Sequence, residues 1–188
     1  MNVTVARFLT GQLLLAMPGI GDPRFERAVI AMCSHDDEGA MGIGIGHILP
    51  QVSLHNMLRQ FDIPTDAVPD IGVLRGGPVE PQRGFILHSR DWGGQGTVEV
   101  AGKWALSGTL DALRVIGRPE GPSRWLVALG YAGWGEGQLE GEMQRHGWQL
   151  ADGDAQLVFE TETPARWGAA FGAQGIDPRL LAHESGRA

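Results

Sequence analysis

Two glycine-rich turns carry the residues of this chain that are best suited to binding a ligand. The first turn runs from Gly76 to Arg83, and its two leading glycines let the backbone form a concave nest of N–H groups. Arg83 can supply positive charge to such a nest, and Glu80 a carboxylate. We therefore predict a groove at Gly76, Gly77, Glu80 and Arg83 that holds a small molecule or a protein segment.

The second turn runs from Tyr131 to Gln138, between an apolar strand at 125–130 and the start of a helix. Free N–H groups and the helix dipole converge at such a point, which favours anion binding. However, Glu136 already places a negative charge there, and the Gly-Lys-Ser/Thr sequence of a P-loop is absent. We interpret the turn as a tightly packed aromatic loop. The alternative is that Tyr131, Trp134 and Gln138 line a pocket or an interface.

An alternative hypothesis is a small hydrolase or transferase. The residues on which it would draw are His35, Glu80, Arg83 and His88. They would have to meet in one cleft within hydrogen-bond reach of a substrate. His88 and Ser89 are neighbours on a predicted strand and point to opposite faces, so they do not form a nucleophile–base pair unless the backbone turns. We assign no catalytic residue.

The sequence also offers few residues for thiol catalysis or metal binding. Cys33 and His35 lie two apart on a predicted strand, where they would share a face and a histidine could activate a thiolate. A lone cysteine in an apolar strand is more often a core residue. One cysteine cannot build a structural zinc site, and the histidines show no metal-ligand spacing. We expect no metal and no cofactor.

Length and charge narrow the class of protein. The chain has 188 residues, the size of one domain, and 43% of them are hydrophobic, which is enough for one core. Its 15 Lys and Arg against 22 Asp and Glu leave a net charge of −7, which argues against direct binding to nucleic acid. No apolar run reaches the ~20 residues of a membrane-spanning helix. The single cysteine fits a reducing compartment, so we expect a cytoplasmic protein.

Strands and helices are interleaved without strict alternation. The apolar runs 28–35 and 40–45 flank an acidic turn and predict a hairpin. Glycines alternate at 42, 44 and 46, so another part of the backbone is expected to lie against that face. Further strands are predicted at 13–17, 71–74, 85–88, 97–100, 125–130 and 156–160. Helices are predicted at 54–61 with Ser53 as the cap, from Ser107 or Thr109 to 117, at 138–145, and from 163 and 177. This pattern predicts an α/β (α+β) fold, a single domain over 1–188 with a bent, barrel-like mixed sheet flanked by helices.

Seven ordered sequence blocks resemble the YqgE/AlgH family of bacterial proteins. They are LTGQLLLAMPG at 9–19, DPRF at 22–25, GAMG at 39–42, GGPV at 76–79, GYAGW at 130–134, GQLE at 137–140 and GIDP at 175–178. The resemblance implies a compact α/β fold on a bent sheet, in a bacterial cytoplasm. Some family members are called transcriptional regulators, and the resemblance carries over no catalytic residue set. Gly46 stands where the family tends to have an asparagine, whose side chain glycine cannot replace.

Taken together, the residues favour a non-catalytic binding or regulatory module. The glycine and aromatic blocks concentrate in the two turns without a nucleophile, base and orienting group beside them. A transcriptional regulator, as the resemblance implies, would act through a protein or small-molecule partner, because the acidic charge opposes direct contact with DNA. The identity of that partner and the oligomeric state are left open by the sequence.

Overall fold

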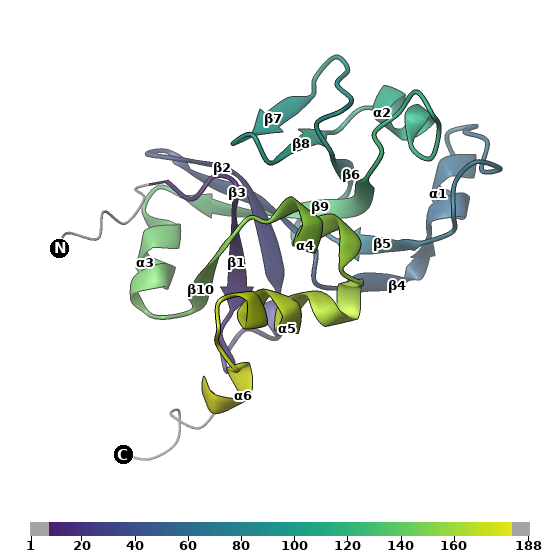
Figure 1. Cartoon of the computed structure of the whole chain (residues 1–188). Helices are drawn as coiled ribbons and strands as arrows, with labels where there is room; N and C mark the ends of the chain where they lie inside the picture. Colours follow the sequence, from purple (N-terminus) through teal and green to yellow (C-terminus); the bar gives the residue numbers. More distant parts are fainter. Residues whose placement is uncertain (1–7, 182–188) are drawn as a thin grey trace.

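A curled sheet of ten strands forms the centre of the molecule (Figure 1). The computed structural model describes residues 8–181. The strands are β1 (Gln12–Ala16), β2 (Val29–Asp36), β3 (Gly39–Gly44), β4 (Ile48–Ser53), β5 (Gly72–Arg75), β6 (Val79–His88), β7 (Val98–Val100), β8 (Trp104–Ser107), β9 (Trp125–Gly135) and β10 (Trp148–Asp152). The helices are α1 (Leu54–Arg59), α2 (Leu110–Val115), α3 (Gln138–Gln144), α4 (Ala155–Glu160), α5 (Thr163–Ala173) and α6 (Pro178–Leu181), with a 3-10 turn, η1, at Pro23–Phe25.

The long strand β9 joins two halves of this sheet. Its C-terminal part pairs with β3 and continues the antiparallel order β10-β1-β2-β3. Its N-terminal part lies between β6, which is antiparallel, and β5, which is parallel with Leu74 opposite Ala128. The change of partner falls near Gly130, whose φ of +74° glycine adopts without steric cost. The bent, mixed sheet expected from the sequence is confirmed.

Helices cover both halves of the sheet, and three apolar clusters lie between them and the strands, the first of which spans the two halves. Phe171 of α5 and Val158 of α4 pack with Leu13 and Leu15 of β1, while Leu139 of α3 packs with residues on the opposite side of β1 and β2. A third cluster lies under α1 and α2. Figure 1 shows α3 beside β10 at one end of the sheet and α1 beside β4 at the other. Burial of each such side chain contributes about 1.5–3 kcal/mol.

Short polar signals set the helix boundaries. The hydroxyl of Ser53 accepts a hydrogen bond from the backbone N–H of Asn56 at the start of α1, and Thr109 does the same for α2. Asp154 caps α4 by accepting from the N–H of Gln156. The strand predicted at 156–160 is therefore wrong. A short apolar run has no periodicity that separates strand from helix, and here the cap decides.

Three strands, β4, β8 and β10, have no counterpart in the sequence prediction. β4 contains Pro50, which argues against a strand in a pattern-based reading. The structure tolerates this proline because β4 is an edge strand that pairs with β5 alone. β8 and β10 span only 4 and 5 residues, and Ser107, offered by the sequence as one start of the following helix, is instead the last residue of β8. No helix within residues 8–181 has the length and apolarity that crossing a membrane requires.

Candidate functional site

A hollow of about 350 Å³ opens where the two half-sheets meet, and we call it the junction hollow. Its walls include the backbone of Gly44 and Gly46 from the end of β3, and of Gly76 and Gly77 after β5. Leu129 and other apolar side chains of the adjacent strands complete the lining. The volume lies in the range of small-molecule sites in proteins.

Close backbone approach builds these walls. The N–H of Gly44 donates to the carbonyl of Gly76 at 2.7 Å, and the N–H of Gly76 donates to the carbonyl of Leu129 at 2.8 Å. A Cβ atom at Gly44 would overlap the carbonyl oxygen of Arg75, and one at Gly76 would overlap that of Gly130. The expectation that backbone lies against the alternating glycines of β3 is confirmed at Gly44.

A buried arginine fixes the segment between the two wall glycines of β3. Arg166 of α5 is 2% exposed, and its guanidinium donates to the carbonyl oxygens of Ile45 and, at 2.8 Å, Thr161. Burial lowers its pKa to about 10, so the side chain stays protonated at neutral pH. Because Ile45 lies between Gly44 and Gly46, this clamp ties α5 to the wall of the junction hollow.

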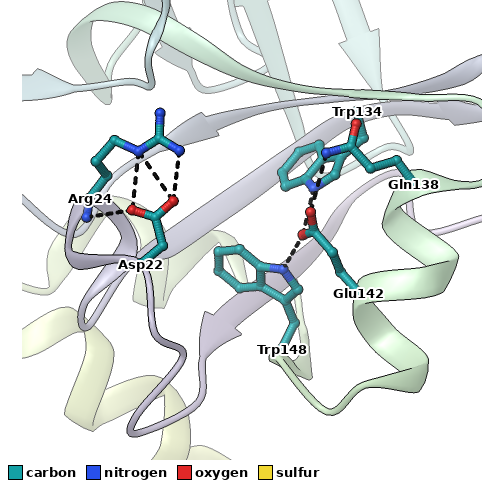
Figure 2. A network of polar contacts seen from close by, with 6 residues as sticks. All are labelled: Asp22, Arg24, Trp134, Gln138, Glu142 and Trp148. Atoms are coloured by element: carbon teal, nitrogen blue, oxygen red, sulfur yellow. Dashed lines mark hydrogen bonds and ion pairs between the residues drawn. The ribbon is translucent and has the colours of Figure 1, made fainter.

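The ionisable side chains that line the junction hollow are all basic. Arg24, Arg75 and His47 line it, and no Asp or Glu does. Arg24 is held by Asp22, with Nη2 2.7 Å from Oδ2 (Figure 2), and its hydrogen bonds lower the pKa of the Asp22 carboxyl. His47 lies with Nε2 2.7 Å from the carbonyl oxygen of Glu26, to which that nitrogen donates. Arg75 is exposed and forms no ion pair with any described residue.

The first predicted turn contributes only part of its residues to this hollow. Gly76 and Gly77 line it, but the N–H of Gly76 is already bonded to Leu129, so the predicted nest lacks that donor. Glu80 and Arg83 form an exposed pair at 3.3 Å and lie outside the lining. Arg83 stacks over the ring of Phe85, 5.0 Å from its centre.

The residues predicted for the second turn divide between two places. Tyr131 packs edge-on against Phe85, with 5.9 Å between ring centres, and so lies near Arg83. Trp134 and Gln138 instead meet Glu142 of α3. The structure thus brings Gly76, Gly77 and Tyr131 together along β9, and places Trp134 and Gln138 at α3.

The contacts of Glu142 make a compact polar network (Figure 2). One carboxylate oxygen accepts the indole N–H of Trp134 at 2.9 Å and that of Trp148 at 2.8 Å. The other oxygen accepts from the amide of Gln138 at 3.3 Å. Because these groups satisfy one another, the network anchors α3 to β9 and β10. Sequence reasoning missed Glu142, although its spacing of four residues from Gln138 places both on one helix face.

The histidines of the enzyme hypothesis do not converge. His35 is 7% exposed, with Nε2 2.9 Å from Glu140 and Nδ1 accepting from the N–H of Leu9. His88 is fully buried in the other half-sheet, with Nε2 2.9 Å from the Ser107 hydroxyl. Its Nδ1 lies 2.8 Å from the backbone carbonyl of Ser89 rather than near that residue's hydroxyl.

Cys33 and His35 also lie apart, and the prediction that they share a face is wrong. A β-bulge between Met32 and Ser34 shifts the alternation of β2. Cys33 therefore packs in the cluster with Phe171, whereas His35 meets Leu9 and α3 on the other side. Burial raises the pKa of the Cys33 thiol to about 12, which makes the thiolate scarce at neutral pH.

Several lining residues of the junction hollow were not predicted as a site. Arg24 and Phe25 belong to the DPRF block that follows the first strand, and Arg75 is the residue before the first glycine turn. Within residues 8–181, no three His, Cys, Asp or Glu side chains are grouped so that they could hold a metal ion.

These features define a class: a curled, largely antiparallel α/β protein with a ligand-sized hollow where one bent strand joins two half-sheets. The chain belongs to the AlgH-like family, whose sequence model matches residues 13–179. Its fold is similar to the solution structure of AlgH from Pseudomonas aeruginosa, with a TM-score of 0.79, 34% identity and full coverage of both chains. A crystal structure from Corynebacterium diphtheriae at 21% identity shares the fold, with a TM-score of 0.74 over 92% of this chain and 90% of that one.

Sequence relatives agree with this assignment. A UPF0301 protein of Rhizorhabdus wittichii is 58% identical over 180 residues, which cover 96% of this chain and 97% of the relative. A UPF0301 protein of Novosphingobium aromaticivorans is 56% identical over 183 residues, covering 97% and 98%. The names of these relatives specify no activity.

Proposed function

We propose that this protein is a non-catalytic binding module that holds a small organic anion in the junction hollow. The observation that carries the proposal is the charge of the lining. The whole chain has a net charge of −7, yet the charged residues at this hollow are arginines, with a histidine beside them. Because Asp22 neutralises Arg24, the uncompensated positive charge is that of Arg75, and such a charge at a concave site attracts an anion.

Arg75 is the group assigned to the anion. Its guanidinium has no carboxylate partner among residues 8–181, whereas Arg24 is neutralised by Asp22. A guanidinium offers paired donors that match a carboxylate or a phosphate. The surrounding surface is apolar, with Phe25, Leu49 and Leu129 in the lining, and suits the body of an organic molecule.

Rigid walls support this role. The hydrogen bonds of Gly44 and Gly76 lock the backbone on one side, and the Arg166 clamp holds Ile45. A preformed site loses little conformational entropy when a ligand binds, so a small molecule with few contacts can be held. A flexible protein segment would lose more entropy on ordering in the same hollow.

A regulatory role, in this proposal, runs through occupancy of the hollow rather than through contact with DNA. The acidic surface opposes binding to phosphate backbones, and the basic residues of the hollow sit in a concave site. We place the protein in the cytoplasm, where a buried, unpaired Cys33 stays reduced.

Calorimetry with a matched ligand pair tests the proposal. Hexanoate and hexanamide have the same shape and differ in charge. We expect hexanoate to bind about 10- to 150-fold more tightly, the factor that corresponds to a charge-assisted hydrogen bond of about 1.5–3 kcal/mol. Arg75→Gln should remove that advantage. Arg114→Gln makes the same change of net charge at an exposed site outside the hollow and should leave it intact. Equal affinity for the two ligands, or retention of the advantage in Arg75→Gln, contradicts the proposal.

A further inference from the structure

A second cavity of about 600 Å³ adjoins the junction hollow, and we call it the neutral hollow. It lies between α1 and α2 on one side and β6 on the other. Gln51, Pro81 and Leu129 line both cavities, so the two meet along a shared rim. The two hollows are therefore neighbouring compartments with a shared part of their lining.

The two compartments differ in charge. Arginines line the junction hollow, whereas the neutral hollow is lined by no Asp, Glu, Lys, Arg or His. Its surface includes Met57 and Phe61 of the α1 region and Leu110 and Leu113 of α2. Phe61 and Leu110 are 43% and 41% exposed, which leaves apolar area that a ligand could cover.

The most buried polar side chain in this lining, Ser107, already has hydrogen-bond partners within the protein. Ser107 is 1% exposed, and its hydroxyl lies 2.9 Å from Nε2 of His88 and 2.8 Å from the hydroxyl of Thr97. The Nδ1–H of His88 donates to the carbonyl of Ser89, so Nε2 is an acceptor and Ser107 is the donor to it. The Ser107 proton is therefore not available to a ligand. The remaining lining combines apolar side chains with uncharged polar ones such as Asn56, Gln60 and Gln82.

We propose that the ligand of this protein is an amphiphilic anion, a carboxylate or phosphate that bears a linear alkyl or acyl chain. Its charged end binds at Arg75 in the junction hollow, and its chain crosses the rim at Leu129 into the neutral hollow. This inference rests on the proposed function for the position of the charged end. The charge boundary between the two compartments is what selects a ligand with one charged and one apolar end.

Linear carboxylates of increasing length test the inference on the intact chain. The probes are butanoate, octanoate and dodecanoate, each measured by calorimetry below the concentration at which it forms micelles. Burial of each methylene contributes about 0.8 kcal/mol, so we expect the affinity to rise about fourfold per added CH₂ until the neutral hollow is filled. The stoichiometry should stay at one ligand per chain.

A pair of glycine variants tests the location of the chain. Gly84 lies on β6 in the lining of the neutral hollow, and an added Cβ there would meet no atom within 4 Å. Gly84→Leu should fill space in the hollow and reduce the gain from butanoate to dodecanoate at least tenfold, with butanoate unchanged. Gly135→Leu is the matched control, because Gly135 is also a strand glycine with an open Cβ position but lies outside both cavities.

The outcomes separate this inference from the proposed function. If butanoate binds to the unaltered protein and a longer chain does not increase the affinity, the proposal of an amphiphilic ligand is wrong, while the proposed anion site is retained. If no carboxylate binds, the proposed function itself fails. A chain-length gain that survives Gly84→Leu undiminished in a folded variant places the chain elsewhere and overturns the inference.

Discussion

The carbonyl oxygen of Arg75 occupies the space that a side chain at Gly44 would need. This approach joins the end of β3 to the end of β5, and the Gly44–Gly76 hydrogen bond of 2.7 Å holds it. The wall of the junction hollow thus depends on a glycine at position 44, although the backbone φ there is one that any residue can adopt. The constraint at Gly44 is one of space.

Gly44→Ala is therefore expected to destabilise the fold. A methyl group in a filled space forces backbone shifts that cost about 1–3 kcal/mol in the free energy of unfolding. The control is Gly168→Ala in α5, where an added Cβ meets no atom within 4 Å and alanine favours the helix by about 0.5–1 kcal/mol. Urea denaturation measures both. Equal effects of the two substitutions would refute the space argument.

Glu142→Ala should loosen the contact between α3 and the sheet. The substitution leaves the indole N–H groups of Trp134 and Trp148 without their acceptor, and each unsatisfied donor costs about 1–3 kcal/mol. We expect a total loss of about 2–4 kcal/mol by chemical denaturation. Glu136→Ala, on the exposed loop before α3, should change stability by no more than about 0.5 kcal/mol. A Glu142→Ala variant as stable as this control would contradict a structural role for the network.

Cys33 should be unreactive in the folded protein. With its pKa at about 12, only about one thiol in ten thousand is ionised at pH 8, and the sulfur is also buried. A thiol reagent such as dithionitrobenzoate should react stoichiometrically in concentrated guanidinium and far more slowly in native buffer. Rapid reaction of the native protein would show an accessible thiolate and revive the cysteine hypothesis.

The stability of the protein should fall as the pH drops below about 6.5, in part through His88. Burial lowers the pKa of His88 below its value of 6.5 in an unfolded chain, so the unfolded state binds more protons in that window. His88→Gln keeps an acceptor for Ser107 and does not titrate, so its stability should decline less between pH 7.5 and 5.5. The ring resonances of His88 should titrate below 6.5 in NMR spectra. Titration at or above 6.5 would contradict this.

Local signals allowed much of the fold to be predicted from the sequence. The acidic turn before Gly39 marks the β2–β3 hairpin, and Ser53 and Thr109 mark the starts of α1 and α2. The exceptions have identifiable causes. The bulge after Met32 reverses the faces of β2, and the cap at Asp154 turns a short apolar run into a helix. The hydrophobic pattern alone shows neither where a β-bulge falls nor whether a short apolar run that follows a capping residue forms a helix or a strand.

The candidate site was harder to predict because its residues come from distant segments. The alternating glycines indicated that backbone packs against β3. They did not indicate which segment, and the one that does, Arg75 and Gly76, lies some thirty residues away. Arg24 reaches the same hollow from the turn after β1. Such convergence depends on how β9 bends near Gly130, which is a property of the whole sheet rather than of any local window.

The most direct test of the central claim is an NMR titration of the ¹⁵N-labelled protein with octanoate. The account predicts that the largest amide shifts fall at Gly44, Gly46, Gly76 and Gly77, extend to Gly84, and shrink in Arg75→Gln. Shifts centred on Trp134 and Gln138 instead, or no saturable shifts at all, would contradict an anion site at the junction of the two half-sheets.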